Sequence, residues 1–430
     1  MKISSACRCL ALSLVLSAAA SAQVITRVSI ATSGAEGNGD SFSPSLSQRG
    51  HLVVFYSKAA NLVPNDLNAA QDVFLHDRIA GTTVRVSVSS GGVEGNGESY
   101  NSVISGDGRF VAYNSAASNL IPSDGNGVED IFVRDLASST TSRISVNSAG
   151  RASDGNSYYP TMSANGRFVA FMSFASNLVA GDTNANSDIF VHDRLLGITK
   201  RVSVGPAGVE GNGISEWSEI SADGNRVVFL SRASNFVAGD SLESSDVFVR
   251  DIRNATTICV SVDPSGLPGT GICGSGSISG DGLTVGFGST SSSLVAGDTN
   301  HLTDIFSHSL VTGVTTRVSV SSSGVQGDQL SWYLTPGSLS YDGRYVAFKS
   351  AATNLVPFDL NGELDIFVRD QRLLTTTRVN VDAQGVEAFG GRSSTPTISA
   401  DGRYVGFYSF ANNLVPADGN SAADVFIRKL

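Results

Sequence analysis

Residues 101–147 read NSVISGDGRFVAYNSAASNLIPSDGNGVEDIFVRDLASSTTSRISVN. The segments 101–105, 110–116, 130–135 and 143–147 are short, rich in β-branched and aromatic residues, and lack a helical period. Gly106-Asp107-Gly108-Arg109 has the composition of a tight turn. This stretch therefore predicts four β-strands.

The same stretch recurs along the chain. Its best marker is Asp-x-Asn-x-x-x-Asp followed by Ile/Val-Phe, with a repeat period of about 58 residues. The marker begins at Asp66, Asp124, Asp182, Asp240, Asp298, Asp359 and Asp418. Four short strands per unit at this period predict the blades of a β-propeller.

The two ends of the chain predict how the ring closes. The last unit stops at Leu430, just after its third strand, and residues 26–30 (TRVSI) match the missing fourth strand. We therefore expect an all-β, seven-bladed β-propeller of four-stranded antiparallel blades, in which the N-terminal strand completes the last blade. Closure of this kind removes exposed sheet edges.

Residues 1–22 have the pattern of a signal peptide: Lys2 and Arg8, an apolar stretch, and Ala20-Ser21-Ala22 before the cleavage site. Residues 23–430 are then a single propeller domain. No later segment is long and apolar enough to span a bilayer. We expect an exported protein, periplasmic or secreted, that is monomeric and does not span a membrane.

The charge balance excludes one class of partner. The sequence has 29 Lys and Arg residues against 39 Asp and Glu residues, and loss of Lys2 and Arg8 makes the net charge about −12. Binding of nucleic acid needs a basic surface, so nucleic acid is not an expected partner.

The segments Ser-Ala-Asp-Gly-Arg-Tyr-Val-Gly-Phe (399–407) and Asp-Val-Phe-Ile-Arg (424–428) carry a family resemblance. They resemble the TolB-type propeller repeat, a relative of WD-type repeats, in its long-loop variety. The resemblance covers nearly the whole mature chain. It implies a periplasmic or extracellular interaction scaffold.

Loop lengths and aromatic residues predict a working face. Two of the four connections in each unit are long, and alternation of strand direction places both on one face. Aromatic residues gather where the chain enters each first strand, and Glu219 is a lone carboxylate among Ser, Thr and Val. The predicted channel-mouth residues are Phe42, Tyr100, Tyr158, Tyr159, Trp217, Glu219, Trp332 and Tyr333. These aromatics either hold a ligand or wedge between blades as core, and Glu219 either contributes to binding or is solvated in the channel.

The repeated acidic motif offers hard oxygen ligands of the kind that Ca²⁺ prefers. The alternative is that these Asp and Asn side chains cap turns by hydrogen bonding to the backbone. The fourth unit has Leu242 in place of Asn. The candidate calcium ligands are Asp66, Asn68, Asp72, Asp124, Asn126, Asp130, Asp182, Asn184, Asp188, Asp298, Asn300, Asp304, Asp359, Asn361, Asp365, Asp418, Asn420 and Asp424.

The mature chain has two cysteines, Cys259 and Cys273, each of which replaces a repeat residue. An exported protein permits a disulfide between them, provided that the intervening chain folds back. Both lie around the fourth blade, and their joint appearance favours that pairing.

Three functions remain open. The first is a non-enzymatic binding or scaffold protein, without a required cofactor, that holds a protein, peptide or glycan on its long-loop face. The second is a carbohydrate-active lyase or hydrolase, and the third is a calcium-stabilised structural surface protein. An enzyme would need blade-specific polar residues clustered at one point, whereas acids repeated in every blade are typical of a scaffold.

Overall fold

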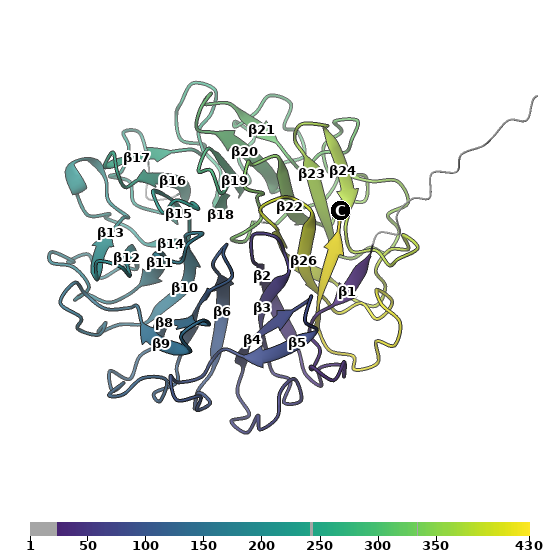
Figure 1. Ribbon diagram of the computed structural model, residues 1–430. Coiled ribbons are helices and arrows are strands. Elements are labelled where there is room, and N and C mark those ends of the chain that lie inside the picture. Colours follow the sequence, from purple (N-terminus) through teal and green to yellow (C-terminus); the bar gives the residue numbers. More distant parts are fainter. Residues whose placement is uncertain (1–23, 241–243, 333) are drawn as a thin grey trace, which may run out of the picture.

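The computed structural model describes residues 24–240, 244–332 and 334–430. Its β-sheets radiate around a central axis, and the predicted seven-bladed β-propeller is confirmed (Figure 1). The predicted signal peptide, Leu242 and Tyr333 lie outside the described residues. We number the blades 1 to 7 in chain order from β2.

The strands occupy equivalent positions from blade to blade. The innermost strands are β2 (Ser41–Leu46), β6 (Ser99–Ile104), β10 (Ser157–Met162), β14 (Ser215–Ile220), β18 (Cys273–Ile278) and β25 (Ser393–Ile398). The second strands are β3 (Leu52–Ser57), β7 (Phe110–Ser115), β11 (Phe168–Ser173), β15 (Arg226–Ser231), β19 (Thr284–Ser289), β22 (Tyr345–Ser350) and β26 (Tyr404–Ser409). The third strands are β4 (Asp72–Asp77), β8 (Asp130–Asp135), β12 (Asp188–Asp193), β16 (Asp246–Asp251), β20 (Asp304–Ser309), β23 (Asp365–Asp370) and β27 (Asp424–Lys429). The outermost strands are β5 (Thr82–Arg85), β9 (Thr140–Arg143), β13 (Ile198–Arg201), β17 (Thr256–Cys259), β21 (Thr315–Arg317), β24 (Thr375–Arg378) and β1 (Ile25–Arg27), and a 3-10 turn spans Pro206–Gly208.

The ring closes as the sequence predicts. The N-terminal strand β1 pairs antiparallel with the C-terminal strand β27, so that Ile25 lies opposite Arg428 and Arg27 lies opposite Phe426. The last blade is therefore built from both ends of the chain. Unfolding of either end would open the ring.

Blade 6 departs from the predicted four strands. Its sheet contains β22, β23 and β24, and the inner segment contributes isolated bridges from Ser331 to Ser350 and from Leu339 to Val346. Thr335-Pro336-Gly337 lies between these bridges. The segment between Ser331 and Ser340 is three residues longer than its counterpart between Ser393 and Ser399, so the ladder is interrupted here.

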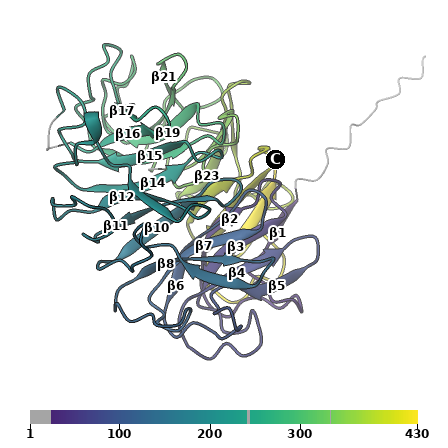
Figure 2. The same ribbon diagram turned by 60° about the vertical axis from the view of Figure 1, so that its left-hand side comes forward.

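Apolar side chains fill the spaces between adjacent blades. One such cluster joins Val54 and Val73 of blade 1 to Val111 and Tyr113 of blade 2. Because every blade packs on two neighbours, the core is a ring of interfaces around the axis. Figure 2 shows the strands of neighbouring blades from a turned view.

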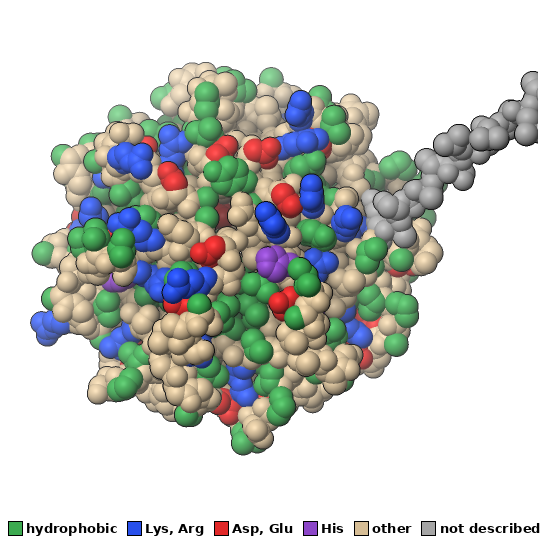
Figure 3. All heavy atoms as spheres, in the orientation of Figure 1, with side chains coloured by type: hydrophobic (Ala, Val, Ile, Leu, Met, Phe, Trp, Pro, Cys, Tyr) green, Lys and Arg blue, Asp and Glu red, His purple; other side chains and the backbone are tan. Residues whose placement is uncertain are grey.

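The two faces of the propeller differ in their connections. In blade 2, residues 105–109 and 136–139 form short connections, and residues 116–129 and 144–156 form long ones. We call the sides that these connections form the short-turn face and the long-loop face. The space-filling view shows basic and acidic side chains interspersed around the centre of one face (Figure 3). In the described residues, no helix is long and apolar enough to cross a membrane.

Candidate functional site

A cavity of about 480 Å³ lies along the axis of the propeller, between the inner strands. Its walls are mostly aliphatic and hydroxyl side chains, to which each blade contributes. Blades 3, 4 and 6 add residues that have no counterpart elsewhere in the ring: Tyr159, Trp217, Glu219 and the inserted Thr335–Gly337 segment.

A β-bulge in the inner strands aims one residue of a blade into this cavity. In blade 3 the pairing of β10 with β11 shifts register between Tyr158 and Thr161, and the other inner strands show the same shift. In five of the six inner strands described, the third residue then takes a left-handed backbone conformation: Ser43 (φ 48°), Asn101 (φ 50°), Tyr159 (φ 54°), Trp217 (φ 53°) and Thr395 (φ 46°). This conformation suits small polar residues and disfavours bulky ones.

Tyr159 and Trp217 are the bulky exceptions, and they lie on neighbouring blades. Their ring centroids are 4.1 Å apart, and their planes are tilted by 35°. Trp217 is 37% exposed. The structure therefore brings two of the predicted aromatic residues together as one aromatic wall of the cavity.

Glu219 lies two residues beyond Trp217 and also lines the cavity. Its Oε2 accepts hydrogen bonds from Ser277 Oγ (2.6 Å) and from the backbone N–H of Ile278 (3.0 Å), and its Oε1 accepts one from the N–H of Gly337 (2.9 Å). Burial raises the pKa of Glu219 to about 7, and these three donors partly oppose the rise. Glu219 thus ties blade 4 to blade 5 and to the insertion of blade 6.

The other predicted aromatic residues take different places. Phe42 packs edge-on against Tyr408 of blade 7, with ring centroids 5.0 Å apart, and Tyr100 donates its hydroxyl hydrogen bond to Glu129 Oε2 (2.6 Å). Tyr158 packs against the apolar cluster between blades 3 and 4, as Tyr159 also does, and Trp332 is half-buried. None of these four residues lines the cavity in the described part of the chain.

Backbone hydrogen bonds encircle the short-turn end of the channel. In the described part of the chain, each short turn beside the axis is linked to the next blade by an N–H···O bond of 2.8–3.1 Å. The linked pairs are Gln48–Gly106, Asp107–Ala164, Ala164–Ala222, Ala222–Gly280, Asp281–Tyr341, Tyr341–Ala400 and Ala400–Gln48. This ring of hydrogen bonds surrounds the short-turn end of the channel, and its residues Gln48, Ala164 and Tyr341 also line the cavity.

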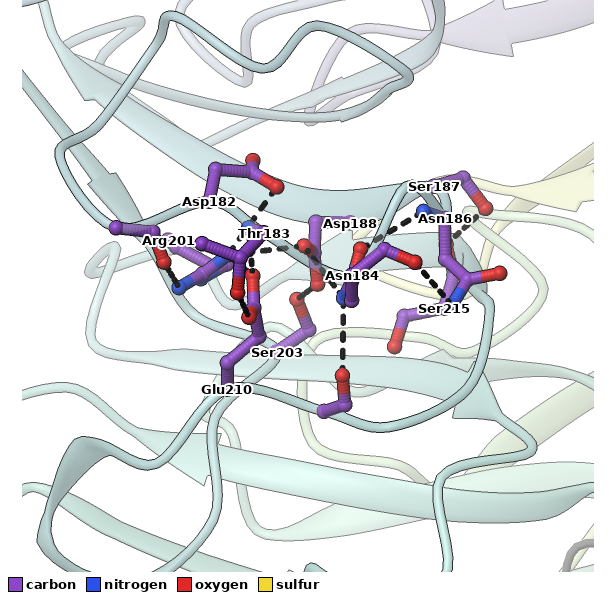
Figure 4. A network of polar contacts seen from close by, with 12 residues as sticks. Asp182, Thr183, Asn184, Asn186, Ser187, Asp188, Arg201, Ser203, Glu210 and Ser215 are labelled. Carbon is purple, nitrogen blue, oxygen red and sulfur yellow. Dashed lines mark hydrogen bonds and ion pairs between the residues drawn. The ribbon is translucent and has the colours of Figure 1, made fainter.

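The acidic motif forms a second constellation, at the outer rim of the long-loop face. In blade 3, Arg201 Nη1 lies 3.2 Å from Asp188 Oδ2 and 3.5 Å from Asp182 Oδ1, and it is also paired with Glu210 (Figure 4). Asp188 is fully buried and also accepts a hydrogen bond from Ser203 Oγ (2.5 Å). Asp188 therefore fastens the third strand to the fourth.

The predicted Asn ligand has another role in this constellation. The Nδ2 group of Asn184 donates to Asp188 Oδ2 (3.3 Å), and its Oδ1 accepts the N–H of Asn186 (2.7 Å). Asn68, Asn300, Asn361 and Asn420 make the same pair of contacts in their blades. The oxygen of this Asn thus closes a turn, as in the turn-capping alternative.

A third carboxylate, which lies outside the Asp-x-Asn-x-x-x-Asp motif, completes four of these clusters. Carboxylate oxygens of three acids lie within 4.8 Å of one another in four clusters of the described chain: Glu36–Asp418–Asp424, Asp66–Asp72–Glu94, Asp182–Asp188–Glu210 and Asp359–Asp365–Glu387. The available signal was the Glu that recurs nine residues after the Arg of each of these units. These acidic groups could hold a metal ion.

Each of the four clusters already contains a cation, the guanidinium of Arg27, Arg85, Arg201 or Arg378. Three carboxylates and one guanidinium leave an excess of two negative charges. Burial and the neighbouring carboxylates raise the pKa values of Asp182, Asp359 and Asp418 to about 6. A calcium ion would fit this donor set only by sharing its oxygens with the arginine or displacing it.

Blades 2, 4 and 5 carry incomplete versions of the cluster. Ala152 stands at the Glu position in blade 2, and Gln326 stands there in blade 5, where its Nε2 donates to Asp298 and Asp304. Blade 4 has lost both the Arg and the Glu, which are replaced by Cys259 and Pro268. Blades 2 and 5 thus keep the arginine, Arg143 and Arg317, without the glutamate, and blade 4 lacks both.

Cys259 ends β17 of blade 4 and Cys273 begins β18 of blade 5, and both are free thiols in this structure. Cys259 Sγ lies 3.3 Å from Ser261 Oγ, and Cys273 Sγ donates to Ser289 Oγ (3.4 Å). Burial raises the pKa of the Cys273 thiol to about 12. The disulfide between them stays a prediction.

No protein-family model and no curated protein sequence matches the chain. Solved structures match it in fold. An oligogalacturonate lyase in complex with manganese superposes with a TM-score of 0.58 at 11% identity, covering 96% of this chain and 94% of that one. An oligogalacturonate lyase from Vibrio parahaemolyticus gives a TM-score of 0.54 at 11% identity, again over 96% and 94% of the two chains. TolB from Acinetobacter baumannii is also similar, with a TM-score of 0.42 at 15% identity over 79% of this chain and 63% of that one.

The central cavity of this chain does not fit a manganese ion. Among the described residues that line it, Glu219 is the one carboxylate, and His, Cys and Asp are absent. Manganese takes several oxygen or imidazole ligands at once. The similarity to the lyases therefore concerns the fold.

Proposed function

We propose that this protein is an exported binding protein, which holds a protein, peptide or glycan by a group that enters the central channel from the long-loop face. The observation that carries the proposal is the convergence of Tyr159, Trp217, Glu219 and the Thr335–Gly337 insertion on one cavity. Repeated residues build the ring, whereas residues unique to one blade have no role that the repeat requires.

Backbone strain supports a binding role for the aromatic pair. Tyr159 and Trp217 occupy positions where other blades place Ser43, Asn101 and Thr395 in the same left-handed conformation. A bulky residue in this conformation is a backbone outlier, and outliers of this kind cluster at binding sites. An exposed indole beside a cavity is also a common anchor for a ligand.

A carbohydrate-active enzyme receives less support from the cavity. Most glycoside hydrolases use two carboxyl groups that face each other across the substrate. The described lining has one such group, Glu219, whose oxygens accept three hydrogen bonds from the protein itself. The arrangement suits a fixed wall of a binding site.

Peptide and glycan panels test the proposed function. The wild type is compared with the double variant Tyr159→Asn/Trp217→Ser, which installs residues that other blades carry at this position. Phe358→Asn is the matched control, because Phe358 is an 85% exposed residue of a rim loop and Asn65 is its counterpart in blade 1. We expect at least one ligand class whose binding falls about tenfold in the double variant and is retained in the control. Binding that is the same in all three proteins would contradict the proposal.

Export rests on the pattern of residues 1–22. N-terminal sequencing of the protein from the source cell is expected to begin at Gln23. Recovery of a chain that still begins at Met1 in the cytoplasmic fraction would contradict export.

We propose calcium stabilisation of the rim as a second property, on one specific observation: three carboxylates meet within 4.8 Å in four blades. The excess of two negative charges in each cluster favours a divalent cation. Thermal unfolding in EDTA and then in added Ca²⁺ tests it, with a calcium-dependent rise of the midpoint expected. An unchanged midpoint would show that the arginine is the one cation that balances the carboxylates of these rim clusters.

A further inference from the structure

We propose that the channel selects a cationic group, an alkylammonium or guanidinium such as a Lys or Arg side chain of a partner peptide, between the Tyr159–Trp217 wall and Glu219. This inference rests on the proposed function and names the chemistry of its ligand. Among a protein, a peptide and a glycan, it selects a peptide as the occupant of the cavity.

The charge of the cavity wall favours a cationic ligand. Glu219 is the charged residue of the described lining, which contains no Lys, Arg or His. An anionic ligand would meet a carboxylate and no balancing cation. A cation would find Glu219 Oε1, which accepts a single hydrogen bond from the protein and keeps a lone pair.

The aromatic wall is the second argument. Tyr159 and Trp217 line the same cavity as Glu219, and the indole is the ring on which cation–π attraction is strongest. The Tyr159 ring covers one side of the indole at 4.1 Å, and the 37% exposure of Trp217 leaves part of its surface accessible. An aromatic face beside a carboxylate is a pairing that recognises ammonium groups.

Charges around the channel are the third argument. The carboxylates of Glu216 and Glu129 lie close enough to Tyr159 to raise the pKa of its hydroxyl, behind the larger effect of burial. Arg232 is the basic group that faces Glu216. Farther out, four rim clusters on the same face each leave an excess of two negative charges. These carboxylates attract cations and repel anions, whereas Lys349, which donates to Ser394 Oγ (3.0 Å), and Arg392 add positive charge beside blades 6 and 7.

The depth of Glu219 gives the site its selectivity. Three hydrogen bonds from β14's neighbours in blades 5 and 6 fix the carboxylate within the channel, so it cannot swing out to meet a ligand at the surface. A flexible chain of methylene groups that ends in a positive charge can lie along the aliphatic walls and bring its charged group to Glu219. A short cation lacks that reach.

The test uses the fluorescence of Trp217. The chain has two tryptophans, so the variant Trp332→Phe leaves Trp217 as the reporter. The probes are acetyl-Gly-Gly-Lys-Gly-Gly-amide, the same peptide with norleucine or Glu in place of Lys, and cellotriose as a neutral sugar. Each is titrated into the millimolar range, and calorimetry repeats the titration with Glu219→Gln and Trp217→Ser.

We expect the Lys peptide to bind about tenfold more tightly than the norleucine peptide, and the Glu peptide to bind most weakly. Glu219→Gln should lower the affinity for the Lys peptide about fivefold and leave the norleucine peptide unchanged. Equal binding of the Lys and norleucine peptides, or a response to cellotriose alone, would overturn the cation inference and leave a channel ligand in place. No response of Trp217 to any of the four probes would overturn the inference, and the peptide and glycan panels would then decide the proposed function separately.

Discussion

The rim of this propeller is built from residues that recur from blade to blade, whereas the channel is lined by residues that differ between blades. At the rim, each blade repeats a buried Asp that accepts a hydrogen bond from a Ser or Asn just after the fourth strand. In every blade except blade 4, an Arg of the fourth strand also pairs with this Asp, as Arg201 does with Asp188. In the channel, the equivalent positions of the inner strands differ from blade to blade. Tyr159 and Trp217 stand there where other blades have Ser43 and Asn101.

This difference distinguishes the residues that stabilise each blade from the residues that are available for function. A contact that recurs at the same place in every blade satisfies a need of the blade, because each blade must hold its fourth strand. Side chains that are unique and yet meet at one point serve no need of the repeat. We therefore attribute stability to the rim contacts, and the proposal of binding concerns the channel.

The largest expected effect is at the rim. Asp188→Ala removes the acceptor of Ser203 and Asn184 and one partner of Arg201, all inside the blade. Loss of such a buried, charged acceptor should lower the free energy of unfolding by about 3 kcal/mol. Urea unfolding followed by circular dichroism measures it.

Blade 4 provides the control for that variant. Asp246 is also buried, but Cys259 stands where the Arg would be, and Ser261 Oγ donates to the carboxylate (2.7 Å). Asp246→Ala should therefore cost less, about 1 kcal/mol. Equal losses at the two positions would show that arginine contributes nothing to the rim.

The second prediction concerns the channel, where Glu219 makes the stability of the protein depend on pH. The folded-state pKa of Glu219, about 7, lies above its ordinary value of 4.5, so the folded protein binds this proton more tightly than the unfolded chain. Its contribution to stability is therefore lost as the pH rises from about 4.5 through 7. Glu219→Gln should gain about 2 kcal/mol of stability relative to the wild type between pH 5 and pH 8. A difference between the two proteins that stays constant with pH would place Glu219 outside that buried environment.

Sequence analysis anticipated the fold better than the site. Seven repeats, the orphan strand 26–30 and the missing strand after Leu430 determine the ring and its closure. The sequence does not reveal which aromatic residues are buried. Phe42 and Trp217 occupy adjacent positions of the repeat, the second and the third residue of the inner strand, and yet point to different places. The β-bulge sends the second residue between blades and the third into the channel, and a two-residue periodicity does not reveal it.

Two further features needed the three-dimensional arrangement. Glu219 meets Gly337, which is 118 residues later in the chain, so their contact depends on the ring and not on the repeat. Glu94, Glu210 and their counterparts fold back onto the Arg of the preceding strand. Nothing in the spacing of the Asp-x-Asn-x-x-x-Asp motif indicates that a third acid completes it.

The third effect concerns calcium at the rim. With a dissociation constant of about 1 mM, as in extracellular modules, 10 mM Ca²⁺ would stabilise each filled cluster by about 1.4 kcal/mol. The raised pKa values of Asp182, Asp359 and Asp418, about 6, mean that protons compete with the cation below that pH. The calcium-dependent rise in melting temperature should therefore be larger at pH 7 than at pH 5. A rise of the same size at both values would point to calcium binding elsewhere.

The smallest expected effect tests the central claim most directly, since it needs no knowledge of the ligand. It is the free energy of unfolding of Tyr159→Asn/Trp217→Ser, in which both positive-φ aromatics are replaced by residues that other blades carry there. If the pair serves a ligand, the variant should be as stable as the wild type or more stable by about 1 kcal/mol, because strain is relieved. A loss of about 3 kcal/mol or more, as expected for deletion of a core aromatic, would show that the pair belongs to the core and would contradict the account.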